Sequence, residues 1–376
     1  MLDRADDVIR SWSRLREMWS LSHSSADPLA RSNSSTAPLE DATRSRLVEL
    51  LNIDGEDAEQ LFARARSQRD EHVGKSIDMR AAIDVGNVCR VNCHYCPMRR
   101  DNLRSSKQSG IMAYRAGTDE VVEIAEHAYS LGFRELFLQS GEDPRLVSEV
   151  RSAVKAIVDA HPDYNITLNL GALDEEEYRS LRAAGARNYL IKHETANAVI
   201  HEHQREETLE YRVAQMLKAR QAGFTIGSGN ILGLPNQTDE DLANDILFLG
   251  RFNIVKMVSC APFTPSNDLP QYMRETAPGD FDKTRRFIAL LRLCFPEARI
   301  PAVSNADSPF IGKKQGKSGQ ALLIDAGANG ITVNFTPTKW EAHYGLYVRG
   351  NEKAYLVSMQ KAHLVSSETG LSVGLL

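Results

Sequence analysis

Three of the chain's five cysteines lie within eight residues, and this group is the strongest chemical signal in the sequence. Residues 89–96 are Cys-Arg-Val-Asn-Cys-His-Tyr-Cys, so Cys89, Cys93 and Cys96 have the spacing C-x3-C-x2-C. Three thiolates can hold three irons of a [4Fe–4S] cluster and leave the fourth iron open to a small ligand, to which it can pass an electron. The spacing therefore predicts that these three cysteines are the ligands of one iron–sulfur cluster.

A structural zinc site and a disulfide are the alternatives for the same cysteines. Zinc prefers four ligands, and His94 would have to fold back within the same short loop to supply the fourth. Zinc sites usually combine a C-x2-C pair with a second, distant pair, which this sequence lacks. Five cysteines in 376 residues are too sparse for a disulfide framework. Cys260 and Cys294 lie in apolar surroundings, which predicts buried and inert thiols.

Composition narrows the class of protein. A chain of 376 residues is long enough for one large α/β barrel or two domains. Apolar residues make up 42% and charged residues 25%, as in ordinary soluble globular proteins. The net charge of −5 provides no basic surface for nucleic acid, and no apolar run is long enough to cross a bilayer. The charged start of the chain lacks the apolar core of a signal peptide. We expect a cytoplasmic protein with no nucleic-acid or membrane partner.

The N-terminal part of the chain is predicted to be helical. Residues 2–19 place apolar side chains on one helical face, which predicts an amphipathic helix that docks on the body of the protein or on a protein partner. The Ser-rich run that follows is typical of a flexible linker. Two more helices are expected near 39–52 and 56–72. We therefore divide the chain into an N-terminal helix and linker (1–38), a helical lead-in (39–78), a barrel (79–340) and a closing segment (341–376) of less regular structure.

From residue 80 onward, short apolar runs alternate with longer helical patterns, which is the signature of a parallel sheet. Strands are expected near 81–86, 134–139, 165–170, 187–192, 224–231, 254–260, 299–303 and 330–334. Helices are expected near 118–131, 145–160, 174–184, 208–222, 238–250, 281–294 and 317–327. This alternation predicts an α/β fold, a (β/α)8 TIM barrel with an N-terminal helical extension. Functional groups in such barrels lie at the C-terminal ends of strands, and the cysteine loop follows the first strand as this rule requires.

The cysteine spacing, with the aromatic Tyr95 before the last cysteine, resembles that of radical S-adenosylmethionine (SAM) enzymes. SAM carries an ammonium group and a carboxylate, and strand ends in this chain offer partners for both. Glu142 follows the second strand and Glu194 the fourth, where an unpaired charge would be costly to bury. Arg212, early in the next helix, is a candidate for the SAM carboxylate. Lys192 is a candidate for an anionic substrate, or else a structural partner of Glu194.

Several longer runs resemble the HydE family, the radical SAM maturases of [FeFe]-hydrogenase, which is related to biotin synthase and methylornithine synthase (PylB). These runs are 86–89, 96–102, 138–144, 193–197 and 233–238, and the likeness covers about residues 40–345. The resemblance implies a TIM barrel of the radical SAM type, one [4Fe–4S] cluster on Cys89, Cys93 and Cys96, and cleavage of SAM. It also implies a set of SAM contacts at Tyr95, Ser140, Glu142, Asn169, Glu194, Arg212 and Leu232. The candidate substrate contacts are Gln139, Lys192, Phe263, Val303, Ser304 and Asn334.

The sequence departs from the HydE pattern around the substrate. Lys192 replaces an arginine and cannot reproduce its bidentate fork, and Val303-Ser304 replaces a Thr-Thr pair. No cysteine follows Cys294, which excludes a second cluster of the C-terminal kind. These departures favour a HydE-like biosynthetic enzyme acting on a small amino-acid-like or sulfur-containing substrate. A HydE-type hydrogenase maturase is the alternative, and a non-catalytic carrier of a cluster or cofactor is an alternative of another class. An external electron donor such as flavodoxin or ferredoxin is expected for either enzyme.

Overall fold

The structure is a computed structural model that describes residues 2–22, 36–104, 110–254, 256–309, 316–344 and 354–375. Most of the predicted linker, residues 23–35, lies outside the described residues.

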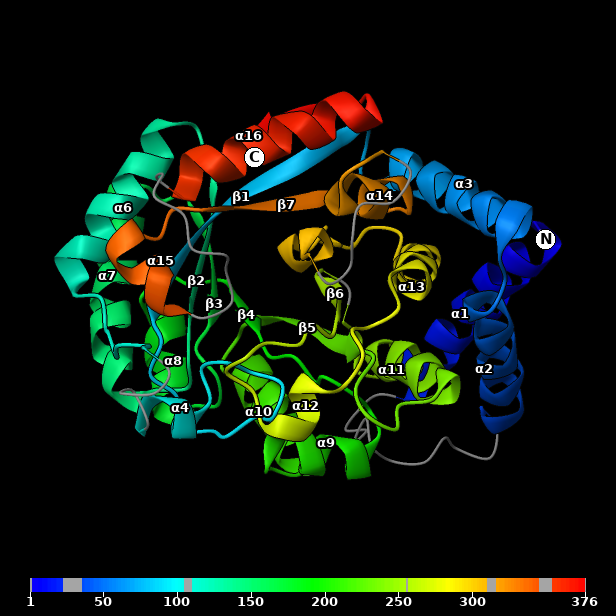
Figure 1. Ribbon diagram of the computed structural model, residues 1–376, viewed down its shortest axis with the longest axis horizontal. Helices are drawn as coiled ribbons and strands as arrows, with labels where there is room; N and C mark the ends of the chain where they lie inside the picture. The colour runs from blue at the N-terminus through cyan, green and yellow to red at the C-terminus, as the bar shows by residue number, and fades with distance from the viewer. Residues whose placement is uncertain are drawn as a thin grey trace.

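A curled parallel sheet forms the centre of the molecule, with helices around its outside (Figure 1). In the described ranges, seven strands follow the order β6-β5-β4-β3-β2-β1-β7. Their bounds are β1 (Ser76–Gly86), β2 (Glu135–Ser140), β3 (Asn165–Asn169), β4 (Asn188–Leu190), β5 (Thr225–Leu232), β6 (Val258–Pro262) and β7 (Gly330–Asn334). Because consecutive strands are joined by helices and all pair in parallel, the predicted (β/α) barrel class is confirmed.

The strand predicted at 299–303 is present only as isolated bridges between the two ends of this sheet. Arg299 bridges to Met257 beside β6, and Pro301 bridges to Gly330 of β7. The Ala302 N–H donates to the Gly330 carbonyl at 2.7 Å, which joins the segment to β7. Proline has no N–H to donate, so Pro301 interrupts the ladder that the sequence pattern predicted. The segment nevertheless links the two edges of the curled sheet.

Helices cover the outer face of the sheet close to their predicted positions. Many begin at a side-chain cap: the Asp174 carboxylate accepts from the Glu177 N–H, and the Thr238 hydroxyl accepts from the Asp241 N–H. Between residues 37 and 344, the described helices are α2 (Ala37–Leu51), α3 (Gly55–His72), α4 (Arg100–Arg104), α6 (Thr118–Ser130), α7 (Val147–Ala160), α8 (Glu175–Ala183), α9 (Ala198–Arg205), α10 (Leu209–Gln221), α11 (Asp239–Arg251), α12 (Gln271–Arg274), α13 (Phe281–Cys294), α14 (Gly319–Asp325) and α15 (Thr338–Tyr344), with 3-10 turns η1 (Pro144–Leu146) and η2 (Ser304–Asp307). None of the helices within the described ranges is both long and apolar enough to span a membrane.

The end of the chain is more regular than the sequence predicted. It forms α16 (Ala354–Thr369) and a short strand, β8 (Ser372–Leu375). β8 pairs in parallel with residues Ser76–Met79 at the beginning of β1, ahead of the stretch of β1 that pairs with β2. This pairing partner lies almost 300 positions away in the sequence, so no local pattern could have revealed it.

The N-terminal helix α1 (Leu2–Ser22) docks on the body of the protein. Its apolar stripe of Ala5, Val8, Trp12, Leu15 and Trp19 is buried, and the helix contacts α2, α3, α11 and α13. The Trp12 ring meets Phe295 edge-on, with 5.2 Å between ring centroids. The Trp19 indole N–H donates to Glu40 Oε1 at 2.9 Å. Of the two expectations for this helix, the structure shows docking within the chain, because the apolar face is covered by the chain's own helices.

Helix α1 packs so closely on α11 that its tryptophan rings leave no room for a side chain at Gly250. A Cβ at this position would lie 2.6 Å from the Trp19 ring and 2.7 Å from the Trp12 ring. Ala normally stabilises a helix relative to Gly, so Gly250→Ala should be favourable if α1 were loosely attached. We expect it instead to destabilise the docked helix by about 1–3 kcal/mol through overpacking.

Hydrogen exchange of the α1 amides measures this effect, and Gly250→Ala should speed their exchange. Gly117→Ala is the matched control, because a Cβ there would meet only Glu120 Oε2 at 3.9 Å. Unchanged exchange in Gly250→Ala would show that α1 is not held as described.

Candidate functional site

The cysteine loop comes after β1, as the sequence predicted, and it also lies against the end of β2. It follows β1 directly, and the turn after β2 comes up against it. A Cβ on Gly141 in that turn would lie 2.3 Å from the Val88 carbonyl oxygen and 2.9 Å from Cys89 Cβ. Only glycine permits this approach, which brings the Glu142 N–H within 3.4 Å of the Cys89 sulfur. The role of Gly141 is therefore to let the two loops touch.

The three thiols share one partly buried environment. Burial and, to a smaller extent, the neighbouring Cys93 raise the pKa of the Cys89 thiol to about 11. Burial also raises the pKa of Cys96, with contributions from Cys93 and Cys89. Thiols that raise each other's pKa lie close together, and the positive charge of a bound metal would offset the repulsion between their thiolates and so favour deprotonation.

Ligation of a single metal ion is a different matter. In the described ranges, no three His, Cys, Asp or Glu side chains are arranged to hold one ion, and this includes the cysteines. A [4Fe–4S] cluster spreads its ligands over separate irons, so its thiolates need not converge on one point. Both ring nitrogens of His94 are engaged, with Tyr272 Oη at 2.6 Å and Glu206 Oε1 at 3.2 Å. The zinc hypothesis therefore loses the fourth ligand on which it depended.

Glu142 connects the cysteine loop to the third strand. Its Oε1 accepts from Arg90 Nε at 2.9 Å, and its Oε2 accepts from the Ala172 N–H at 2.7 Å. Arg212 Nη1 lies 3.9 Å from the same Oε2. Both oxygens therefore have protein partners in this structure, although the sequence suggested an ammonium group as their partner.

Glu194 is buried at the end of the fourth strand, with 7% of the residue exposed. Its Oε2 lies 3.0 Å from Lys192 Nζ, and its Oε1 lies 3.9 Å from Arg205 Nη1. Burial raises the pKa of Glu194, but the cations Lys192, Arg205 and Arg212 outweigh this and hold it below its ordinary value. The residue also has a φ of 62°, which costs a side chain other than glycine about 1–3 kcal/mol. A charged, strained residue in a buried position is a strong candidate for function.

Arg212 and Arg205 form the cationic side of the same site. Arg212 Nε donates to the Lys192 carbonyl at 3.0 Å, and Glu207 Oε1 lies 2.7 Å from Arg205 Nε and 3.6 Å from Arg212 Nε. Arg212 Nη1 and Glu194 Oε2 are buried without a well-aligned hydrogen bond, although each has an ion-pair partner. A buried donor and a buried acceptor of this kind fit a ligand that presents both a carboxylate and hydroxyl or ammonium groups. The residues present therefore fit SAM beside an iron–sulfur cluster.

Tyr95 links the cysteine loop to this charged group. Its hydroxyl accepts from Arg205 Nη1 at 2.8 Å. Its ring packs against a small apolar cluster formed by Ile200, Ile231, Leu234, Phe263, Leu269 and Met273. Phe263, predicted as a substrate contact, therefore belongs to the apolar cluster against which the predicted SAM contact Tyr95 packs.

A row of polar side chains crosses three strands inside the barrel. Asp84 of β1 pairs in register with Gln139 of β2, which pairs with Asn169 of β3. Gln139 Nε2 donates to Asp84 Oδ1 at 2.6 Å, and Thr336 Oγ1 donates to Asp84 Oδ2 at 3.0 Å. Burial raises the pKa of Asp84 from 3.8 to about 7. This row brings the predicted residues Gln139 and Asn169 to one face of the sheet.

The remaining predicted residues are placed less centrally. The Ser140 hydroxyl donates to the Gly141 carbonyl at 2.6 Å, and the side chain of Leu232 belongs to the main hydrophobic core. Val303 packs partly against that core, and Ser304 is exposed at the start of η2. Asn334, at the end of β7, accepts from the Thr336 N–H at 2.9 Å. Direct contact of these five with SAM or substrate stays a prediction, as it does for the other predicted site residues.

Four residues of the site were not predicted from the sequence: Asp84, Arg90, Arg205 and Glu207. Asp84 lies within the apolar run of the strand predicted at 81–86. A carboxylate in such a run is rarely buried without a purpose, so its presence could have indicated a site residue. Arg205 and Glu207 lie in the charged run 205–207, which has the composition of a solvated helix end. Their burial depends on the fold of α9 and α10 around Tyr95, which the local sequence does not reveal.

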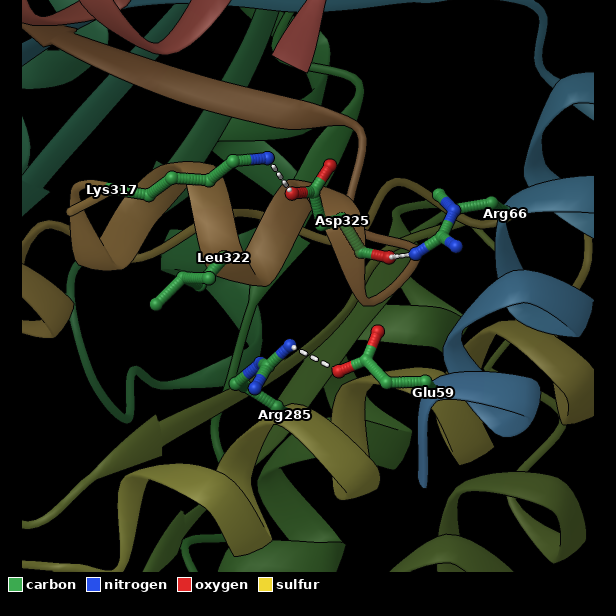
Figure 2. A pocket seen from close by; sticks show the side chains of 6 residues that line it. All are labelled: Glu59, Arg66, Arg285, Lys317, Leu322 and Asp325. Carbon is green, nitrogen blue, oxygen red and sulfur yellow. Dashed lines mark hydrogen bonds and ion pairs between the residues drawn. The ribbon is translucent and has the colours of Figure 1, made fainter. Parts of the chain in front are cut away.

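A recess on the outer wall of the barrel is separate from this site. Figure 2 shows that it is lined from α3, α13 and α14 by Glu59, Arg66, Arg285, Lys317, Leu322 and Asp325. Lys317 Nζ lies 2.7 Å from Asp325 Oδ2, and Arg285 Nη2 lies 3.5 Å from Glu59 Oε1. Arg66 donates to the Asp325 carbonyl at 2.7 Å. Because its cations have partners on neighbouring elements, we assign the recess to helix packing.

Comparison with known proteins agrees with this geometry. Residues 83–249 match the model of the Radical SAM superfamily. The chain is 36% identical over 307 residues to the [FeFe] hydrogenase maturase subunit HydE of Thermotoga maritima, which covers 81% of this chain and 84% of that protein. It is 26% identical to the 3-methylornithine synthase of Methanosarcina barkeri, over 78% of this chain and 80% of that protein. The crystal structure of methylornithine synthase (PylB) superposes with a TM-score of 0.71 at 21% identity, over 88% of this chain and 94% of that one, which shows the shared fold.

The contact at Gly141 predicts the behaviour of Gly141→Ala. The added methyl would push the turn after β2 away from Val88 and Cys89 at a cost of about 1–3 kcal/mol. We expect less iron per chain after anaerobic reconstitution than in the wild type, measured by metal analysis and cluster absorbance. Gly117→Ala, at an open position, should take up iron normally. Wild-type iron content in Gly141→Ala would contradict the close contact.

The raised pKa of Asp84 predicts a pH-dependent stability. Between pH 4 and its folded-state pKa of about 7, the carboxyl is ionised in the unfolded chain but protonated in the folded one. The free energy of unfolding should therefore fall as pH rises through this window, by up to about 4 kcal/mol, and level off above it. Asp84→Asn removes the titrating group, so the wild type should lose stability relative to the variant between pH 5 and pH 8. Urea unfolding of the cluster-free protein measures it.

Glu123→Gln, at an exposed position on α6, is the control for this series. Its stability difference from the wild type should be the same at both pH values. A pH-independent difference for Asp84→Asn as well would contradict the assignment of the buried carboxyl.

Proposed function

Because this chain belongs to the radical SAM superfamily, in the group of HydE, methylornithine synthase and biotin synthase, we propose that it cleaves SAM at a [4Fe–4S] cluster held by Cys89, Cys93 and Cys96. The cluster, when bound and reduced, would supply the electron that splits SAM into methionine and a 5′-deoxyadenosyl radical. The protein's own part is to hold the reacting groups in line and exclude water. The observation that supports this most is the pair of buried atoms Arg212 Nη1 and Glu194 Oε2 near the cysteine loop, which have ion-pair partners but no well-aligned hydrogen bond.

Each charged residue has a proposed task in SAM binding. Arg212 offers Nη1 to the SAM carboxylate, as a guanidinium is suited to do. Glu194 offers Oε2 to the ribose hydroxyls or the ammonium group. Arg205 and Glu207 hold these two in place, since they contact Glu194, Arg212 and Tyr95. Glu142 supports the cysteine loop through Arg90 and its own N–H.

The substrate would bind inside the barrel, below the cysteine loop. Asp84, Gln139 and Asn169 present a polar row there, and Lys192 adds a cation just after β4. These groups suit a small polar substrate such as an amino-acid-like or sulfur-containing molecule. Cys260 and Cys294 are fully buried single thiols, so they offer no site for a second iron–sulfur cluster that could pass on an electron. The electron would therefore come from a small reducing protein such as flavodoxin or ferredoxin.

Two roles for this chemistry are supported by different observations. The 36% identity to HydE over most of both chains supports a maturase role in assembling the [FeFe]-hydrogenase cofactor. The ion pair between Lys192 and Glu194, at 3.0 Å, supports a different substrate, because an arginine at this position would present a fork that Lys192 lacks. The second role is a biosynthetic reaction on a small metabolite.

The test of the proposed function is anaerobic SAM cleavage. We expect the reconstituted wild type with SAM and dithionite to form 5′-deoxyadenosine, detected by mass spectrometry. Cys93→Ala should form none, because it loses one of the three cluster ligands. Amino acids and thiol compounds can then be ranked by how far they accelerate cleavage, and strong acceleration by one of them would support the metabolite role. A wild type that takes up no iron, or that holds a cluster but neither binds nor cleaves SAM, would refute the proposal.

A further inference from the structure

Glu194 is held in an unusual backbone turn. The Thr195 N–H donates to the His193 carbonyl at 2.7 Å, which closes a three-residue turn with Glu194 at its centre and a φ of 62°. Turns of this kind with positive φ are rare and strained. The surrounding structure must therefore supply the contacts that keep Glu194 in this conformation.

Strand β5 supplies the first set of contacts. The Glu194 N–H donates to the Gly229 carbonyl at 3.1 Å, and the Glu194 carbonyl accepts from the Ile231 N–H at 2.8 Å. Both backbone groups of the strained residue are therefore tied to one neighbouring strand, on either side of Asn230.

Asp245 of α11 supplies the second set from behind the sheet. Its Oδ1 accepts from the Ala196 N–H at 2.6 Å, and its Oδ2 accepts from Asn230 Nδ2 at 2.8 Å. His193 Nε2 lies 3.7 Å from Oδ1, and His193 Nδ1 lies 3.0 Å from Ser228 Oγ. We call Asp245, His193, Ser228 and Asn230 the Asp245 clamp. It holds the residues on both sides of Glu194 and the strand to which Glu194 is tied.

The clamp contains serine, histidine and aspartate, the residue types of a hydrolase triad. All four of its members are 0% exposed, so no substrate can reach Ser228 Oγ. The Ser228 hydroxyl also accepts from the His193 backbone N–H at 3.2 Å, which fixes it to the chain. The arrangement is therefore positional and not nucleophilic.

We propose that the Asp245 clamp sets the position of the Glu194 carboxylate for SAM before SAM arrives, with Asp245 as a positioning residue that touches neither SAM nor the cluster. This inference rests on the proposed function and adds how the SAM ligand is held. A carboxylate fixed beforehand loses no conformational freedom on binding, so the clamp increases SAM affinity. It also keeps Glu194 between Lys192 and Arg205 when no ligand is present.

The test is SAM affinity in Asp245→Asn. An asparagine has one acceptor oxygen, so it cannot reproduce both the bond from the Ala196 N–H and the bond from Asn230 Nδ2 with separate oxygens. We expect the dissociation constant of SAM, measured by anaerobic equilibrium dialysis on protein with a full cluster, to rise about tenfold, a loss of the size that freeing one bound group produces. The response of the reduced cluster's electron paramagnetic resonance spectrum to SAM should need about tenfold more SAM than in the wild type, in line with the change in the dissociation constant.

A reciprocal variant separates positioning from general packing. Asp245→Asn combined with Asn230→Asp exchanges the amide and the carboxylate between the two positions. The amide oxygen then at position 245 can accept from the Ala196 N–H, while the amide nitrogen donates to the carboxylate at position 230. The double variant should recover most of the lost affinity.

The matched control is Asp241→Asn, one turn earlier on α11, where the carboxylate binds Asn197 Nδ2 and caps the helix. It should bind SAM within about twofold of the wild type, as expected of a partly exposed helix cap.

The outcomes distinguish this inference from the proposed function. A wild type with a full cluster that binds no SAM would overturn both. A wild type that binds SAM, with Asp245→Asn binding it equally well or the folded double variant showing no recovery, would overturn the clamp alone. If Asp245→Asn does not fold, Asn230→Ala takes its place, since it removes one donor to Asp245 and leaves the Ala196 bond. Unchanged affinity in that variant would also overturn the clamp.

Discussion

The charges collected beneath the cysteine loop are the feature on which the rest of the site depends. Glu142, Glu194 and Glu207 face Lys192, Arg205 and Arg212 over distances of 2.7–3.9 Å, and most of these side chains are buried. Burying so many ionisable groups is costly unless each finds a partner, and apolar residues would pack there at lower cost. Such a network contributes placement more than stability, since each charge restricts where its neighbours can lie.

The parallel arrangement of the barrel strands brings these charges together. Parallel strands direct all their carboxyl ends to one rim, so residues from β1, β2, β4 and the start of α10 meet there although they are far apart in the sequence. Close backbone approaches complete the arrangement. Gly141 lets the turn after β2 touch Cys89, and the strained turn at Glu194 directs a carboxylate into the group. Strain of this kind is found where a structure maintains a functional geometry at some expense of stability.

Outside the rim the structure serves mainly to close and brace the barrel. The segment 299–302 links β6 to β7, and β8 extends the sheet beside the beginning of β1. Helix α1 covers α11 and α13 with its two tryptophans, Trp12 and Trp19. These parts contribute no residue to the cysteine site. The departures from the HydE pattern at Lys192, Val303 and Ser304 fall instead at positions that the sequence predicts to contact the substrate, and that contact stays a prediction.

The sequence by itself predicted the three cysteines as cluster ligands and determined the succession of strands and helices that places Glu194 and Arg212 at the rim. These are local properties, set by the spacing of a few residues or by the period of the apolar positions. Only the tertiary structure decided that Glu142 is bonded to Arg90, that Arg205 and Glu207 belong to the site, and that Asp245 supports Glu194. The partners of a buried polar group lie tens of residues away in the chain, and only packing determines which of the many charged side chains are brought together.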